Sequence, residues 1–255
     1  MVKSRFFITL SYNGKNYVGW QIQPNGMSVQ QILQESLSTI LRSNVEVVGA
    51  GRTDAGVHAH KMFAHFDWEG DDFIIEDLIH KLNNYLPKDI SIHNIQPVKP
   101  DAHARFSAVS RCYKYYVTTK KDPFLNELSH RVYFVPDVER MNSLCNILLE
   151  YEDFSSFSKS HTDVKTNNCK IDFAKWEQEG DMYVFTIKAD RFLRNMVRAI
   201  VGTLLEAGRG NLDERGMHRI IQAKNRQVAG DSVPGHALYL EDVKYPDDIW
   251  GEYSC

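Results

Sequence analysis

The sequence predicts an α+β protein made of two similar halves, each with an antiparallel sheet and flanking helices. Segments rich in β-branched and aromatic residues alternate with segments of helical period. In the first hundred residues their order is strand, helix, strand, strand, helix, strand, which is the ferredoxin-like or RRM-like order. The second part resembles it. We therefore expect two ferredoxin-like halves with an active-site cleft between them.

In the first half, Ser28 with Gln31 three residues later resembles a capping box, and apolar residues then recur at helical spacing. Asp71 and Asp72 open a second helical pattern that Pro87 ends. The expected elements are strands at 5–12, 45–50, 59–68 and 90–98, with helices at 28–42 and 71–86.

The second half is expected to have strands at 111–119, 169–177, 182–190 and 237–244, with helices at 137–150, 191–207 and 213–224. Pro97 and Pro100 favour a boundary near 99–106. This predicts an N-terminal domain at 1–105 and a C-terminal domain at 106–255.

The composition is that of a water-soluble globular protein. The 255 residues are 43% hydrophobic and 25% charged, long enough to bury a core without cross-links. The sequence has no apolar run long enough to span a membrane, and its N-terminus does not read as a signal peptide. Its four cysteines form no C-x-x-C pair. We expect a cytoplasmic protein with no membrane association.

The net charge of −3 is unevenly distributed. Residues 99–131 hold seven Lys/Arg and three Asp/Glu, and residues 188–226 hold nine and four. Residues 67–77 hold six acids and no base. Basic regions on an otherwise acidic chain suit a protein that binds phosphates in one place.

The most unusual segment is GRTDAGVH at residues 51–58, a polar, glycine-bounded loop between two apolar strands. It lacks the lysine and hydroxyl that a phosphate-binding loop carries after its second glycine. Two interpretations remain. Asp54 and Gly56 could simply form a turn, or Asp54 could be a functional carboxylate on a rigid loop beside Arg52.

Together with five further segments, this loop resembles the tRNA pseudouridine synthase A family, whose members modify the anticodon stem-loop. The loop GRTDAGVHA is similar to the family's catalytic loop. The other similar segments are YNGKNYVGWQ at 12–21, HARFSA at 103–108, RCYKY at 111–115, DFSSF at 153–157 and FLRNMVRAIVG at 192–202.

The resemblance implies an isomerase that converts uridine to pseudouridine at positions 38, 39 and 40 of tRNA. It implies a homodimer, no cofactor and no metal. The target base lies in a helical stem or loop and has to be flipped out into a pocket. The alternatives from the residues alone are a non-catalytic RNA-binding or chaperone protein and a small-molecule phosphate-transfer enzyme, against which the missing lysine counts.

By the same resemblance Asp54 is the catalytic carboxylate, acting as a nucleophile at C1′ or C6 or as a base at C2′. Arg198 is the cation that pairs with it, and Tyr113 stacks on the target uracil, with a possible part in proton transfer. Arg52 lies on the RNA side of the pocket. Leu238 matches a pocket-lining leucine.

Helix geometry adds further RNA-binding candidates. On a helix over 191–207, Arg191, Arg194 and Arg198 fall within roughly 60° of one another, opposite an apolar face. Arg105, Lys114 and His58 complete the predicted substrate-binding set. We expect His58 to make a local hydrogen bond, because His58, His60 and His65 form no convincing metal set.

Two positions depart from the family pattern. Ala102 stands before His103 where the family has Phe, and Ala237 replaces a glycine before Leu238. The second departure raises the question of whether the backbone there needs a glycine.

Overall fold

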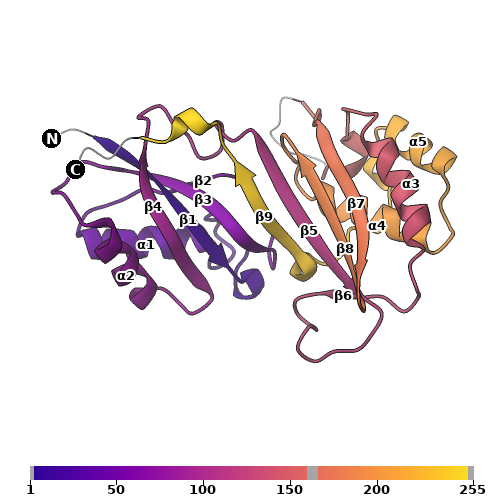
Figure 1. Cartoon of the computed structure of the whole chain (residues 1–255), viewed down its shortest axis with the longest axis horizontal. Coiled ribbons are helices and arrows are strands. Elements are labelled where there is room, and N and C mark those ends of the chain that lie inside the picture. The colour runs from indigo at the N-terminus through magenta and orange to yellow at the C-terminus, as the bar shows by residue number, and fades with distance from the viewer. Residues whose placement is uncertain (1–2, 160–165, 252–255) are drawn as a thin grey trace. The chain divides into compact units, whose positions relative to one another are not determined.

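The computed structural model describes residues 3–159 and 166–251, so Cys255 lies outside the described part. The chain folds as two compact units (Figure 1). Unit 1 comprises residues 1–109 and 240–255, and unit 2 comprises residues 110–239. The structure is α+β with mostly antiparallel pairing, as predicted.

In unit 1 the sheet order is β4-β1-β3-β9, and β2 also pairs with β3. With β2 beside β3, the first four strands have the ferredoxin-like arrangement. The elements are β1 (Ser4–Tyr12), η1 (Gly14–Asn16), α1 (Val29–Leu41), β2 (Val48–Gly49), β3 (His58–Trp68), α2 (Ile75–Tyr85), β4 (Ile90–Val98), β9 (Leu238–Lys244, from Leu240 on in this unit) and η5 (Asp247–Ile249).

Unit 2 has the antiparallel order β5-β8-β7, with the short β6 parallel to β5. Its elements are β5 (Ser110–Thr118), β6 (His130–Arg131), α3 (Val138–Leu148), η2 (Ser155–Phe157), β7 (Ile171–Glu179), β8 (Met182–Ala189), α4 (Met196–Gly208), α5 (Glu214–Gln222), η3 (Arg226–Val228) and η4 (Gly235–Ala237).

The division of the chain differs from the predicted one at its C-terminal end. Residues 240–255 return to unit 1, where β9 pairs with β3 and the Val109 N–H donates to the Lys244 carbonyl. The backbone hydrogen bonds of this last strand decide which unit it joins, and a sequence pattern does not show its pairing partner.

Helix α1 begins as predicted, because the Ser28 hydroxyl accepts the Gln31 N–H at 3.2 Å. The Gln31 side chain donates to Glu35. The strand expected at 45–50 shortens to Val48–Gly49. In the residues before this strand, side chains of α1 accept backbone N–H groups. Ser38 Oγ accepts the Val45 N–H at 3.0 Å, and the Gln34 side chain accepts the Val47 N–H at 3.1 Å.

The predicted basic face on a helix over 191–207 is wrong. Helix α4 begins only at Met196, after Asn195 in the left-handed region (φ 67°), so Arg191 and Arg194 lie outside it. Eleven of the 13 residues of α4 are buried. It is thus a helix that is apolar nearly all round, the kind that occupies a protein core.

The segment around Asp231 packs closely on α4 at Gly202. A Cβ there would lie 1.8 Å from the Asp231 carbonyl oxygen. The segment after η3 therefore lies directly on the helix backbone and covers part of the side that was predicted to be a basic, RNA-binding face.

Within residues 3–159 and 166–251, no helix is long and apolar enough to cross a membrane.

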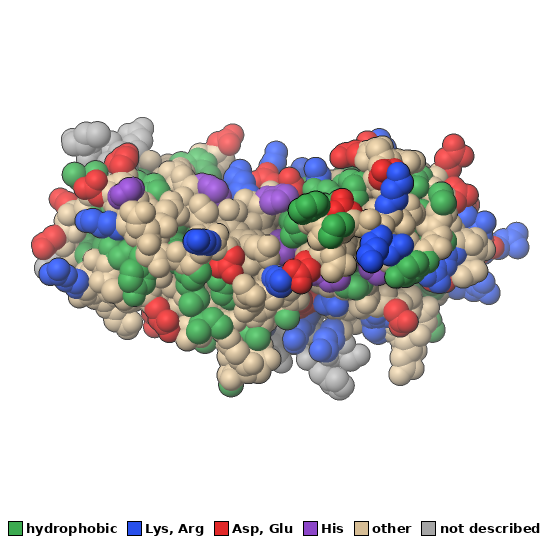
Figure 2. Space-filling model, turned by 90° about the horizontal axis from the view of Figure 1, so that it is seen from below, with side chains coloured by type: hydrophobic (Ala, Val, Ile, Leu, Met, Phe, Trp, Pro, Cys, Tyr) green, Lys and Arg blue, Asp and Glu red, His purple; other side chains and the backbone are tan. Residues whose placement is uncertain are grey.

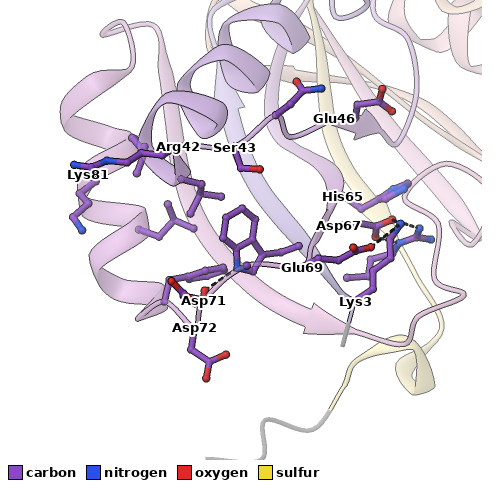
Figure 3. A pocket seen from close by; sticks show the side chains of 18 of the residues that line it. Lys3, Arg42, Ser43, Glu46, His65, Asp67, Glu69, Asp71, Asp72 and Lys81 are labelled. Atoms are coloured by element: carbon purple, nitrogen blue, oxygen red, sulfur yellow. Dashed lines mark hydrogen bonds and ion pairs between the residues drawn. The ribbon is translucent and has the colours of Figure 1, made fainter. Parts of the chain in front are cut away.

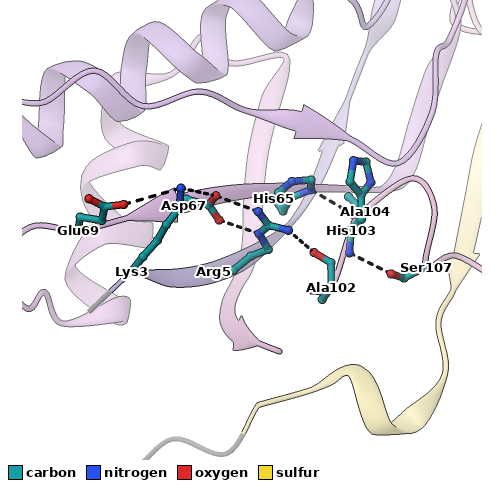
Figure 4. Close-up of polar contacts among 9 residues, drawn as sticks. All are labelled: Lys3, Arg5, His65, Asp67, Glu69, Ala102, His103, Ala104 and Ser107. Atoms are coloured by element: carbon teal, nitrogen blue, oxygen red, sulfur yellow. Dashed lines mark hydrogen bonds and ion pairs between the residues drawn. The ribbon is translucent and has the colours of Figure 1, made fainter. Parts of the chain in front are cut away.

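His65 on β3 is a buried histidine whose Nδ1 accepts the Ala104 N–H at 3.1 Å (Figure 4). Burial, and next the charge of Arg5, lower its pKa from 6.5 to about 4. Between these two pH values the unfolded chain binds a proton at His65 that the folded chain does not.

We therefore expect stability to fall as the pH drops from about 6.5 towards 4. Urea unfolding at pH 7 and pH 5 checks this for the wild type and His65→Asn. The wild type should lose more free energy of unfolding between the two pH values than the variant. The exposed His93→Asn is the control and should behave like the wild type. Equal pH dependence in His65→Asn and the wild type would contradict the assignment.

Candidate functional site

The loop at residues 51–57 connects β2 to β3 in unit 1. Asp54 is partly exposed and Arg52 is exposed, whereas Thr53 between them is 8% exposed. The Thr53 hydroxyl shares a buried hydrogen bond of 2.8 Å with the Tyr12 hydroxyl at the end of β1. The residue before the carboxylate is thus fixed in the core while the carboxylate reaches solvent.

The segment at 12–20 holds this loop through its backbone. The Trp20 N–H donates to the Thr53 carbonyl at 3.2 Å, and the Gly56 N–H donates to the Tyr17 carbonyl at 3.4 Å. Inside the loop the Val57 N–H donates to the Asp54 carbonyl at 3.2 Å. The expected turn is therefore present, with Gly56 at φ 77°.

Two glycines make this close approach possible. A Cβ on Gly14 would lie 2.0 Å from the Val57 carbonyl oxygen, and one on Gly19 would lie 2.3 Å from the Thr53 carbonyl oxygen. Gly19 also has φ +113°, which side chains rarely adopt. The segments 12–21 and 51–59 are thus a single packed unit, although they are about 30 residues apart in sequence.

His58 makes the local hydrogen bond expected of it. Its ring is 2% exposed, and Nδ1 accepts the Gly14 N–H at 3.0 Å. His60 contacts Glu241 at 2.9 Å, and His65 accepts from Ala104. The three histidines therefore have separate partners. Among the described residues, no three His, Cys, Asp or Glu side chains are grouped to hold a metal ion.

In unit 2, Tyr113 lies on β5 and is half-buried. Its ring meets Phe192 edge to face, with centroids 5.1 Å apart. Tyr115, two residues on and hence on the same face of the strand, is fully buried and donates to the Pro234 carbonyl at 3.0 Å. Phe192 therefore helps to set the orientation of the Tyr113 ring.

Arg198 on α4 is tied to the same region. Its Nε donates to the Val233 carbonyl at 2.7 Å, and the Val233 N–H donates back to the Arg198 carbonyl at 3.3 Å. Burial raises the pKa of Tyr115, and the nearby charge of Arg198 opposes that rise. Arg198 and Tyr113 therefore lie on the same side of the unit 2 sheet.

Leu238 is 5% exposed and follows η4. Ala237 before it is buried, and it is not among the residues with positive φ. The backbone here therefore does not need the glycine that the family pattern has. Ala102, the other departure, is also buried, and its carbonyl accepts from Arg5.

The structure groups the predicted residues by unit. Arg52, Asp54 and His58 lie together in unit 1, whereas Tyr113, Arg198 and Leu238 belong to unit 2. The other four predicted residues are Arg105, exposed in a turn of unit 1; Lys114, on the opposite face of β5 from Tyr113; and Arg191 and Arg194, which flank Phe192 before α4. On the face drawn in Figure 2, Lys and Arg side chains gather toward the unit 2 end.

No role was predicted for Tyr12, Gly14, Gly19 or Phe192. A signal existed for the glycines, because two of them within six residues of a segment without regular periodicity indicate close backbone contact. No sequence signal identifies Phe192 as the neighbour of Tyr113.

A separate hollow of about 1070 Å³ lies in unit 1 (Figure 3). Its lining includes six Asp and Glu but only four Lys and Arg. Basic Lys3, Arg42 and Lys81 line it together with acidic Glu46, Glu69, Asp71 and Asp72. Such a surface does not attract a polyanion.

Comparison with known proteins identifies the chain as an RNA-modifying isomerase. The chain belongs to the tRNA pseudouridine synthase family, whose sequence pattern matches residues 8–107 and 150–246.

Similar proteins named tRNA pseudouridine synthase A occur in several bacteria. That of Parabacteroides distasonis is 63% identical over 96% of this chain and 98% of its own length. That of Bacteroides thetaiotaomicron is 59% identical, covering 97% of this chain and 93% of its own. That of Exiguobacterium sibiricum is 35% identical, covering 97% and 99%.

The glycine contact predicts a large effect of Gly19→Ala. A Cβ at positive φ costs about 1–2 kcal/mol, and overlap with the Thr53 carbonyl adds roughly 1–3 kcal/mol more. Gly180→Ala is the matched control, because Gly180 has φ +61° with nothing within 4 Å of its added Cβ. Urea unfolding should show Gly19→Ala to be the more destabilised by at least about 1 kcal/mol. Equal losses would mean that the close approach contributes little.

Proposed function

We propose that this isomerase converts uridine to pseudouridine at positions 38, 39 and 40 of the tRNA anticodon stem-loop. Conversion of tRNA uridine is the activity of the family to which the chain belongs. The observation that carries the proposal for the site is the loop at 51–57, where the partly exposed Asp54 belongs to a backbone fixed on both sides.

The reaction conserves every atom of the nucleotide. The N1–C1′ bond breaks, the uracil rotates, a C5–C1′ bond forms, and the hydrogen on C5 is transferred away while N1 takes up a proton. The Asp54 carboxylate can act as a nucleophile at C1′ or C6, or as a base at C2′. Each role requires an ionised carboxylate, and we assign Arg198 as the cation that favours it.

The target base has to leave the helical stack before it can react. The half-exposed ring of Tyr113, held edge-on by Phe192, offers a face on which a flipped uracil can stack. Arg52, two residues before Asp54, is exposed, and we assign it to contact with the RNA. Leu238 contributes an apolar wall.

We also propose that the protein acts in the cytoplasm as a homodimer. The net charge of −3, with basic residues concentrated in two sequence regions, limits nonspecific RNA binding and makes tRNA affinity fall with salt. A sedimentation mass of 29.4 kDa in solution, that of a single chain, would contradict the dimer.

A non-catalytic RNA-binding protein would need the basic residues but not the fixed carboxylate. The family membership and the intact Asp54 loop therefore favour the enzyme.

Incubation of the purified protein with unmodified tRNA, followed by pseudouridine mapping, tests the function. We expect product at positions 38–40 where uridine is present. Asp54→Asn should lower the rate by about a thousandfold or more, because it removes the catalytic group itself. Its tRNA Kd should change by less than about threefold, since an uncharged isostere keeps the loop contacts.

Two results would overturn parts of this proposal. Product confined to the D-arm or T-arm would refute the assigned positions. An Asn variant that works at the wild-type rate would refute the role of Asp54.

A further inference from the structure

The segment from Ala102 to Ser107 in unit 1 is a turn that presents an aromatic ring to solvent. Phe106 is 74% exposed, and its neighbour Arg105 is exposed as well. Ala102 and Ala104 earlier in the turn are buried. Leaving a phenylalanine side chain in water forgoes about 2 kcal/mol of burial.

The turn that carries Phe106 is fixed by its own hydrogen bonds. The His103 N–H donates to Ser107 Oγ at 2.9 Å, and the Ser107 N–H donates to the His103 carbonyl at 2.9 Å. His103 Nδ1 accepts the N–H groups of both Arg105 (3.1 Å) and Phe106 (3.3 Å). The backbone on both sides of the exposed ring is therefore ordered in advance.

The turn is also anchored to the rest of unit 1 (Figure 4). Arg5 donates to the Ala102 carbonyl at 2.8 Å, and the Ala104 N–H donates to His65 Nδ1 at 3.1 Å. The Tyr245 hydroxyl donates to the Ala104 carbonyl at 2.6 Å. These bonds hold Phe106 outward instead of letting it pack on the sheet.

A cation accompanies the ring. The Arg105 guanidinium lies 5.4 Å from the Phe106 centroid, and the His103 ring lies 4.4 Å away on a tilted plane. An aromatic face beside a guanidinium is the pair of groups that binds an unpaired nucleotide, the base by stacking and the phosphate by charge.

The size of the apolar surface also favours a nucleotide over a protein. Apart from Phe106, the large exposed hydrophobic residue nearby in the chain is Val109, which is 54% exposed. One phenylalanine side chain offers at most roughly 250 Å². A stable protein interface needs about 800 Å² on each partner.

We propose that Phe106 and Arg105 form a contact for an unpaired nucleotide of tRNA, separate from the target uridine. The proposal rests on the proposed function for its choice of RNA. The turn contacts β3 at His65, seven residues along the strand from His58 beside the catalytic loop. At about 3.3 Å per residue, His65, which anchors the turn, lies roughly 20 Å along the strand from that loop. The role of the contact is therefore to hold the tRNA and not to act in the chemistry.

The test measures the Kd of unmodified tRNA by fluorescence anisotropy, together with kcat at saturating tRNA. Phe106→Ala should weaken binding about five- to a hundredfold, the range for loss of one base–aromatic stack, with kcat within about twofold. Phe106→Tyr keeps a ring and should restore the wild-type Kd. Arg105→Gln should lower the slope of log Kd against log salt by about one.

Phe124→Ala is the matched control. Phe124 is 87% exposed in unit 2, and its N–H donates to the Asp122 carboxylate at 2.8 Å, so an anion lies beside it. Its loss should leave the tRNA Kd within about twofold of the wild type, because an anion disfavours a phosphate neighbour.

Three outcomes overturn the proposal. These are a Phe106→Ala Kd within about twofold of the wild type, an equal loss in Phe124→Ala, and an altered sedimentation mass in Phe106→Ala, which would assign the ring to contact between copies of the chain. The failure of this proposal can be told apart from the failure of the proposed function. If the wild type makes no pseudouridine yet binds tRNA with the same dependence on Phe106, the contact stands and the proposed reaction fails.

Discussion

The contact between the segment at 12–20 and the loop at 51–57 is the constraint on which the candidate site depends. A loop of seven polar and small residues has no core of its own and would sample many conformations. Backbone hydrogen bonds to Tyr17 and Trp20 and the buried Tyr12–Thr53 pair remove that freedom. This order matters for the role proposed for Asp54, at a ribose or uracil carbon, because small displacements of a reacting group are costly.

The glycines of this contact show why the two segments have to be read together. Gly14 and Gly19 are needed because carbonyl groups of residues 57 and 53 occupy the space of a Cβ. The requirement lies in the loop, while the residue that satisfies it lies on the preceding segment. The glycines of the first segment are therefore explained only by the backbone of the second.

Unit 2 positions its predicted site residues through a different set of contacts. Helix α4 is buried nearly all round, so it behaves as a core element that carries Arg198 at its first turn. The segment around Val233 lies on the backbone of α4 and also receives the buried Tyr115 hydroxyl at Pro234. The packing of this segment on α4 thus sets the positions of Arg198, Tyr115 and the residues that precede Leu238.

Most of the fold was predictable because periodicity and caps are local. Ser28 begins α1, and the strands at 5–12, 59–68 and 90–98 agree with β1, β3 and β4 to within a residue. The failures depend on long-range contacts. The start of α4 is set by Asn195 at positive φ, and the last strand joins unit 1 through pairing with β3. The prediction of a basic helix face containing Arg191 and Arg194 is therefore wrong, because both residues precede α4.

The candidate site was predictable to the extent that it rests on sequence resemblance. Asp54, Tyr113 and Arg198 follow from matched segments, and their roles stay predictions. The support for those residues could not be predicted. The bonds of Tyr12 to Thr53 and of Gly14 to His58 join residues more than 40 positions apart, and nothing in the local sequence marks such pairs.

Amide hydrogen exchange in the tRNA-free protein tests the central claim most directly. If the loop at 51–57 is held by the preceding segment, the amides of Gly14, Trp20 and Val57 should exchange slowly and with a common opening free energy. In Gly19→Ala all three should exchange faster together. Rapid exchange of these amides in the free wild-type protein would contradict the account, because it would mean that the loop is ordered only when RNA binds.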